Sequence, residues 1–247
     1  MRVLAFDTAT RATTVALSGV GEVVYTARDD PGAGERPGHA TRLLPLTAMV
    51  LDRAGIGWEE VDRIAVGIGP GTFTGLRIGI ATARALARAR DVPLVGVSTL
   101  QSLALAGRRA RVAVTGPTAA TMPARLLDAV IAVIDARRGE VFAAGWRIDE
   151  VEEFDTALVR PHPFAPGALA ELLAPLGPTA LAIGDGAIAF RQVLERSGAF
   201  IPDDDSQLHR VTATNHCRLA TALQASVPDE VRPDYLRAPD AEIAHRR

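Results

Sequence analysis

The segment from Gly67 to Gly79 has the residue types and spacing of a ligand-binding loop. Its five glycines lie between an expected strand and an expected helix, where phosphate loops and anion sites at helix N-termini form. It carries neither a dinucleotide G-x-G-x-x-G setting nor the lysine of a Walker A motif. Alternatively it is a tight turn, in which glycines permit positive φ and Thr74 caps the helix. The sequence favours the turn, with these structural residues: Gly69, Pro70, Gly71, Thr74, Gly75 and Arg77.

Other catalytic and metal-binding patterns are missing from the sequence. The five histidines are never spaced as metal ligands, and no G-x-S-x-G segment supports a hydrolytic triad. All 27 basic residues are arginine, which excludes Schiff-base chemistry and a lysine general base. The single cysteine, Cys217, excludes an internal disulfide and is expected to be a small buried side chain. The acidic run at 203–205 lacks EF-hand spacing and is expected to be solvated. We therefore expect no metal site and no cofactor.

Composition indicates a globular chain. Its 247 residues are 48% hydrophobic and 23% charged, so the chain can bury a core and is not intrinsically disordered. No stretch approaches the ~18 to 20 apolar residues of a membrane helix, and no basic-then-apolar leader opens the sequence. We therefore expect a cytoplasmic protein with no membrane partner. The net charge of −2 opposes binding of nucleic acid by the chain alone, so RNA contact is expected through a local patch or a more basic partner.

The apolar pattern predicts the same succession of elements, β-β-β-α-β-α, in both halves of the chain. In the first half, strands are predicted over 2–7, 13–18, 22–28, 64–68 and 93–97, and helices over 39–54, 76–90 and from a Ser98 cap to about 106. In the second half, strands are predicted over 129–135, 141–148, 153–159 and 180–183. Helices are predicted there over 167–173, 187–197 and 214–225, the last capped by Thr212 or Thr214.

Two copies of this succession, each opening with a strand that ends in aspartate, are typical of the actin-like ATPase (ribonuclease-H-like) fold. We predict an α/β protein of two related halves, with a first domain over 1–106 and a second over 107–247. The last helix is able to pack back on the first half. Residues 107–124 are rich in Arg, Gly, Pro, Thr and Ala, and are predicted to be a linker or a mobile insertion.

Asp7 and Asp135 are the two aspartates that end these opening strands. In actin-like ATPases, carboxylates at such strand ends orient a metal-bound water at a phosphate. Alternatively, each aspartate forms a turn by accepting hydrogen bonds from nearby backbone N–H groups. Because no lysine and no cluster of metal ligands lies nearby in the sequence, the turn is favoured.

The helices predicted over 39–54 and 76–90 carry more apolar surface than one sheet can cover. Apolar side chains span roughly 200° of the first helix, whereas covering a sheet requires an arc only slightly wider than about 100°. In the second helix, Arg77, Arg84 and Arg88 form one stripe, and small residues permit close helix packing. Either both helices are enclosed within the same fold, or they form a protein–protein interface. The candidate interface residues are His39, Leu43, Leu46, Val50, Ile80, Ala83 and Arg84, with Leu46, Val50 and Ile80 as anchors.

The run Gly-Pro-Gly-Thr-Phe-Thr-Gly-Leu-Arg-Ile-Gly at 69–79 resembles the hallmark of the bacterial TsaB (YeaZ) family. The similarity is strong over 1–106 and looser beyond, and it does not extend to 107–124. Other similar segments are Asp7-Thr8-Ala9-Thr10, the helix start at 39–46, the run at 135–141, and Pro233-Asp234-Tyr235-Leu236-Arg237.

The resemblance implies a role in forming threonylcarbamoyladenosine at position 37 of tRNAs that read codons beginning with A. Members of the family pair, through the two helices above, with the catalytic paralogue TsaD, and they act with the ATPase TsaE and a threonylcarbamoyl-adenylate donor. The paralogue binds metal through a His-x-x-x-His helix, and its two ligand positions fall here on Thr99 and Leu103, which cannot hold a catalytic metal.

The resemblance therefore implies a non-catalytic subunit that contacts tRNA only through the complex and forms a homodimer when alone. The alternative from the residues is an active enzyme, either an actin-like ATPase or a metallopeptidase of the glycoprotease kind.

Overall fold

The computed structural model describes residues 1–32, 34–114, 127–153 and 155–237. The chain divides into two compact units. Unit 1 contains residues 1–102 together with the described residues from Val211 onward, and unit 2 contains residues 103–210. Unit 1 therefore includes the helix at 213–222. Among the described residues, no helix has the length and apolar character needed to cross a membrane.

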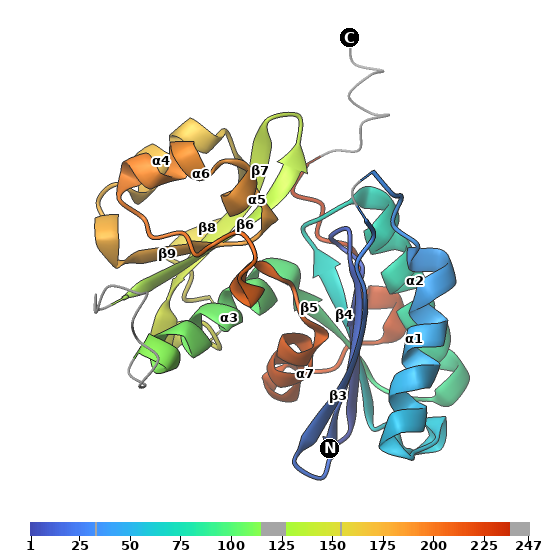
Figure 1. The fold of residues 1–247 in the computed structure, drawn as a ribbon. Coiled ribbons are helices and arrows are strands. Elements are labelled where there is room, and N and C mark those ends of the chain that lie inside the picture. Colours follow the sequence, from blue (N-terminus) through green and yellow to red (C-terminus); the bar gives the residue numbers. More distant parts are fainter. Residues whose placement is uncertain (33, 115–126, 154, 238–247) are drawn as a thin grey trace. The chain divides into compact units, whose positions relative to one another are not determined.

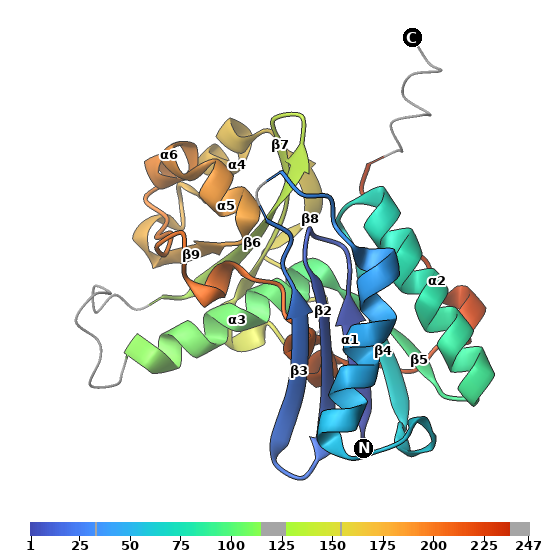
Figure 2. The ribbon, with the colours of Figure 1, turned by 45° about the vertical axis from the view of Figure 1, so that its right-hand side comes forward.

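Unit 1 is a mixed sheet with helices on both faces (Figure 1). Its strands lie in the order β3-β2-β1-β4-β5, with β1 antiparallel to β2 and parallel to β4. Helices α1 and α2 pack side by side on one face, as Figure 2 shows, and α7 packs on the other. The central strand β1 is completely buried because it has strands on both edges and helices on both faces. The bounds are β1 Val3–Asp7, β2 Thr13–Val20, β3 Val23–Asp29, α1 His39–Ala54, β4 Arg63–Gly69, α2 Phe73–Arg90, β5 Leu94–Ser98 and α7 Ala213–Ala222.

Unit 2 repeats this topology. Its strands lie in the order β8-β7-β6-β9, with β6 antiparallel to β7 and parallel to β9, as β1 is to β2 and β4. A single parallel bridge from Leu181 to Phe200 occupies the place that β5 has in unit 1. This repeat confirms the predicted actin-like α/β fold. Helix α3, Thr99–Val114, begins in unit 1 and continues into unit 2. The other bounds are β6 Ala129–Arg137, β7 Glu140–Arg147, β8 Val159–Phe164, α4 Pro166–Leu173, β9 Ala180–Ile183, α5 Asp185–Ala189 and α6 Arg191–Leu194.

Short 3₁₀ helices complete the described chain, at Trp58–Glu60, Ile148–Glu150, Gly177–Thr179, Glu195–Ser197, Gln207–His209 and Pro228–Glu230. The Ser98 cap is confirmed, because the Ser98 hydroxyl accepts a hydrogen bond from the Gln101 N–H (3.3 Å). Thr212 is the N-cap residue of α7, but its side chain makes no capping hydrogen bond.

Apart from shifts of up to three residues, as at the start of α2 and the end of α7, three predicted elements differ from the structure. The helix predicted to end near 106 continues to Val114, because the Arg- and Ala-rich sequence there favours helix; residues 115–124 of the predicted linker lie outside the described residues. The strand predicted over 153–159 was placed too early: β8 contains two prolines, which an edge strand tolerates and which conceal it in the sequence. The helix predicted over 187–197 breaks at Phe190, whose backbone is not helical (φ −118°, ψ 26°).

Candidate functional site

The turn between β4 and α2 packs directly on the residues that follow β1. The Thr72 N–H donates to the Ala9 carbonyl (2.7 Å), and the Thr8 hydroxyl donates to the Gly75 carbonyl (2.7 Å). A Cβ atom at Gly75 would lie 1.9 Å from the Thr8 carbonyl oxygen, and one at Gly71 would lie 2.3 Å from the Ala9 carbonyl oxygen. These glycines are therefore required by close backbone packing, as expected of a structural turn.

The structure corrects the predicted helix cap of this turn and adds a cis peptide bond. The helix begins at Phe73, with Thr72 as its N-cap residue, so the predicted cap Thr74 lies inside the helix and is exposed. The peptide bond between Gly69 and Pro70 is cis, and Gly69 has a φ of 111°, which favours glycine.

The Asp7 carboxylate lies at the centre of a fully buried polar cluster in unit 1. Its Oδ1 atom accepts a hydrogen bond from the Ala9 N–H (2.7 Å), which confirms the predicted turn. Its Oδ2 atom accepts from the Thr99 hydroxyl (2.8 Å) and lies 2.9 Å from Nε2 of His216 on α7. Burial raises the pKa of the Asp7 carboxyl, but His216, the Ala9 N–H and the Thr99 hydroxyl together hold it below its ordinary value. Both carboxylate oxygens are therefore engaged by the protein itself.

His216 extends this cluster to a serine. Its Nδ1 atom lies 2.8 Å from the Ser102 hydroxyl, so Ser102, His216 and Asp7 are arranged in series. The sequence analysis missed this series, because no sequence motif links residues 7, 102 and 216. All three side chains are completely buried, whereas the serine of a hydrolytic triad is open to its substrate. It joins β1, α3 and α7.

Asp135 lies near the end of β6 in unit 2 and also accepts a local backbone hydrogen bond. Its Oδ1 atom accepts a hydrogen bond from the Arg137 N–H (2.8 Å), which confirms the predicted turn, and its Oδ2 atom lies 3.0 Å from the Arg137 guanidinium. The Asp135 N–H donates to the carboxylate of Asp185 (3.0 Å), whose pKa is raised by burial. Both oxygens of the Asp135 carboxylate are therefore also engaged by the protein, in this case by Arg137.

The resemblance aligns the paralogue's metal-ligand positions with Thr99 and Leu103. Thr99 donates to Asp7, and Leu103 is fully buried. Within the described ranges, no three His, Cys, Asp or Glu side chains converge as a metal site would require.

Most of the candidate interface residues lie in the core of unit 1. Leu43, Leu46, Val50, Ile80 and Ala83 pack in one buried cluster, and Val50 has no exposed surface. His39 is buried too, with Nδ1 2.8 Å from the Thr13 hydroxyl, and burial lowers its pKa. The prediction that these side chains face a partner is therefore wrong, because they are the apolar arc that covers the sheet.

The surplus apolar arc of α1 is nevertheless present, on the opposite side of the helix. Leu44 and Met49 are 50% and 42% exposed, and Ala40, Pro45 and Ala48 beside them are also exposed. On α2, Ala81 and Ala85 are exposed. We call these residues the α1–α2 face: Ala40, Leu44, Pro45, Ala48, Met49, Ala81 and Ala85.

The arginine stripe of α2 is bound by a segment that follows α7. We call residues 226–237 the strap; in Figure 2 the strap is red and lies against α2. Arg84 donates from Nε to the Val231 carbonyl (2.9 Å) and from Nη2 to the Asp229 carbonyl (3.1 Å), so this candidate interface residue holds the strap. Arg88 pairs with the Asp229 carboxylate, which lowers the pKa of that carboxyl.

The far end of the strap lies on the turn before α2. The Tyr235 ring stacks on Phe73 with 5.1 Å between ring centroids, and its hydroxyl accepts from Nε of Arg77 (3.2 Å). The Arg77 guanidinium also lies 3.6 Å from the Phe73 ring centre. Arg77 therefore connects the glycine turn to the strap.

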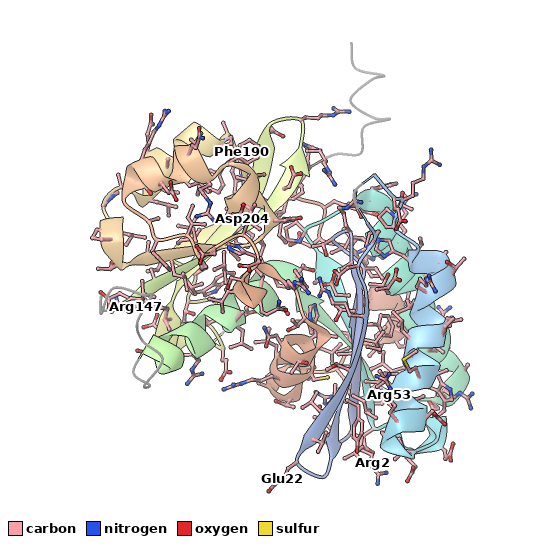
Figure 3. All side chains as sticks on the ribbon, in the orientation of Figure 1. Arg2, Glu22, Arg53, Arg147, Phe190 and Asp204 are labelled. Carbon is pink, nitrogen blue, oxygen red and sulfur yellow. The ribbon has the colours of Figure 1, made fainter. Side chains whose placement is uncertain are left out.

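In the acidic run at 203–205 of unit 2, the central aspartate forms an ion pair. Asp204, labelled in Figure 3, accepts from Arg191 at 2.6 Å, whereas Asp203 and Asp205 are exposed as expected of a solvated loop. Arg191 also donates to the Ile201 carbonyl (3.0 Å), so the run is fixed at its centre.

Cys217 is confirmed as a buried side chain, and it should be chemically inert. Burial raises the pKa of its thiol to about 12, and its Sγ donates to the Val3 carbonyl (3.3 Å). The native protein should release less than about 0.1 equivalent of thionitrobenzoate from Ellman's reagent at pH 8, because the thiolate is the reactive form. The same sample in guanidinium chloride should release one equivalent. Rapid reaction of the native protein would contradict the buried placement of Cys217.

Comparison with known proteins gives consistent matches. The family described as "TsaD: tRNA N6-adenosine threonylcarbamoyltransferase" matches residues 35–242. The tRNA threonylcarbamoyladenosine biosynthesis protein TsaB of Escherichia coli is 39% identical over 150 residues, which cover 61% of this chain and 57% of that protein. A tRNA N6-adenosine threonylcarbamoyltransferase of Novosphingobium aromaticivorans is 46% identical over 72 residues, or 29% of this chain and 21% of that enzyme.

A solved structure agrees over nearly the whole chain. A Pseudomonas aeruginosa protein described as similar to peptidase YeaZ superposes with a TM-score of 0.74 at 27% identity, covering 96% of this chain and 99% of that chain. In sequence, the chain spans just over half the length of the TsaB proteins that it matches.

Proposed function

We propose that this chain, which belongs to the TsaB (YeaZ) family of tRNA threonylcarbamoyladenosine biosynthesis proteins, is a non-catalytic subunit in the cytoplasm that pairs with the paralogue TsaD. With TsaD and the ATPase TsaE, it supports transfer of the threonylcarbamoyl group to adenosine 37 of tRNA. The observation that carries the proposal is the exposed α1–α2 face.

The α1–α2 face has the character of an interface. Leu44 and Met49 are among the large apolar side chains that the described residues expose, and both lie on α1, which also exposes Ala40, Pro45 and Ala48. Clustered exposed apolar side chains on a folded monomer mark interaction sites. A TsaD-like paralogue of related fold presents equivalent helices, which supports a four-helix arrangement. Without the paralogue, the same face pairs with a second copy by two-fold symmetry.

The non-catalytic role is supported by the state of the Asp7 cluster. A carboxylate that orients a metal-bound water needs an oxygen open to that water, whereas both Asp7 oxygens are bound by the protein. The glycine turn packs on the end of β1, so in unit 1 the segment that most resembles a phosphate loop serves packing. These observations disfavour the alternative of an ATPase or metallopeptidase.

Reconstitution tests the proposal directly. We expect TsaD and TsaE with threonylcarbamoyl-adenylate, or with the components that form it, to modify unmodified tRNA only when this chain is added. The chain by itself should neither hydrolyse ATP nor retain about one equivalent of zinc or iron in elemental analysis after purification. Modification at the same rate without the chain would refute the subunit role. ATP turnover by the chain alone would favour the enzymatic alternative.

A further inference from the structure

The three arginines of the stripe all bind oxygen atoms, which is also how arginines bind phosphate groups. Arg88 is paired with a carboxylate, Arg84 with two carbonyl oxygens, and Arg77 with a phenol oxygen. All of these acceptors belong to the strap. Guanidinium groups bind carboxylate and phosphate oxygens through the same fork of donors, so a phosphate can replace the carboxylate at Arg88 without a change in the arginine.

The strap is held unevenly along its length. Its middle is fixed, because Val231 is buried in the core of unit 1 and the Asp234 N–H donates to the Ile68 carbonyl (2.8 Å). The Ser226 N–H at its start also donates to the Leu94 carbonyl (2.9 Å). Between these points the Asp229 side chain is loosely held, since the Arg88 and Asp229 side chains are 57% and 62% exposed. An exposed ion pair is weak and is screened by salt, so Asp229 leaves Arg88 at little cost while the rest of the strap stays in place.

We propose that the arginine stripe of α2 is a binding site for RNA phosphates and that Asp229 of the strap is its internal competitor. The proposal rests on the proposed function, which supplies tRNA as the RNA. Arg84 remains bound to the backbone of the strap, and Arg88 and Arg77 at the two ends exchange their acceptors for phosphate oxygens. The internal carboxylate keeps the affinity of the isolated subunit for tRNA low, in addition to the net charge of −2.

A matched pair of substitutions tests the proposal on the isolated full chain. Asp229→Asn removes the carboxylate charge that pairs with Arg88, and Asp203→Asn removes one charge from an exposed aspartate of unit 2. Both raise the net charge by one, so they separate competition at the stripe from a general charge effect. The probe is fluorescently labelled, unmodified tRNA in anisotropy titrations from about 50 to 200 mM salt, where phosphate contacts dominate RNA binding.

We expect Asp229→Asn to tighten tRNA binding about threefold to tenfold at the lowest salt and to steepen the plot of log K against log salt by about one phosphate contact. Asp203→Asn should change the affinity less than about twofold. Adding Arg88→Gln to the Asp229→Asn variant should remove both the gain and the added slope. Circular dichroism spectra should be identical for all four proteins.

Either of two results would overturn the proposal. Equal gains for Asp229→Asn and Asp203→Asn would mean that only total charge matters, and no gain for either would mean that the strap masks no phosphate site. Because the measurement uses the single chain, a failure to pair with TsaD leaves its outcome unchanged. A failure here likewise leaves the pairing proposal intact.

Discussion

Replacing Asp7 with alanine should lower the free energy of unfolding by about 3–5 kcal/mol, because several buried polar groups lose their acceptor and each unsatisfied group costs about 1–3 kcal/mol. The substitution leaves His216 without its carboxylate in a site that no solvent reaches. It also frees the Ala9 N–H and the Thr99 hydroxyl, which are both buried. Urea denaturation followed by circular dichroism measures the loss.

Asp135 provides the matched control for this substitution. It lies near the end of the equivalent strand of unit 2 and accepts the equivalent backbone hydrogen bond, but its side chain is partly exposed and pairs with the exposed Arg137. Asp135→Ala should therefore cost only about 1 kcal/mol, the typical worth of one hydrogen bond. Similar losses for the two substitutions would show that the buried cluster contributes nothing beyond the turn.

The Asp7 cluster also makes the free energy of unfolding depend on pH. The pKa of Asp7 lies lower in the folded chain than its ordinary value of 3.8, so the unfolded chain binds the proton more tightly. The stabilisation is therefore complete above that ordinary value and is lost as the pH falls through the lower folded pKa. In urea titrations below about pH 4, unfolding of Asp7→Asn should depend less on pH than unfolding of the natural sequence.

The sequence predicts the elements of this fold well because their signals are local. The bounds of α1 and β9 agree with the prediction, since each follows from a periodicity within its own residues. The pairing of Asp7 with His216 has no such signal, because it forms only when α7 packs on the sheet of unit 1. The prolines of β8 gave a misleading local signal, and only its pairing with β7 reveals the strand.

The candidate interface shows a different limit of sequence analysis. The helical wheel correctly indicates that α1 has more apolar surface than the sheet requires, since both Val50 and Leu44 are apolar and only the first is buried. It does not indicate which arc faces the sheet, and the anchors were assigned to the wrong one. Contacts with β2 and β3 decide the orientation, and no pattern within 39–54 contains that information.

The orientation of α1 makes the partner interface testable with two substitutions on one helix. Leu44→Glu places a charge on the exposed α1–α2 face, and Val50→Glu places one in the core. Leu44→Glu should leave the thermal unfolding midpoint nearly unchanged, because exposed apolar side chains contribute little to the folding of the monomer. It should weaken binding to TsaD at least about 100-fold, since an unpaired charge at the centre of an interface must be desolvated.

Val50→Glu provides the contrast, because a buried unpaired carboxylate should prevent stable folding whether or not the partner is present.

Isothermal titration with purified TsaD and sedimentation of the chain alone give the two readouts for Leu44→Glu: loss of the heterodimer and loss of the homodimer. Met49→Glu, at the other end of the exposed patch, should give the same pattern. If Leu44→Glu and Met49→Glu are both folded and still bind TsaD with natural affinity, the α1–α2 face is not the pairing surface. Pairing would then have to use another surface of the chain, because the remaining apolar arc of α1 is already packed against its own sheet.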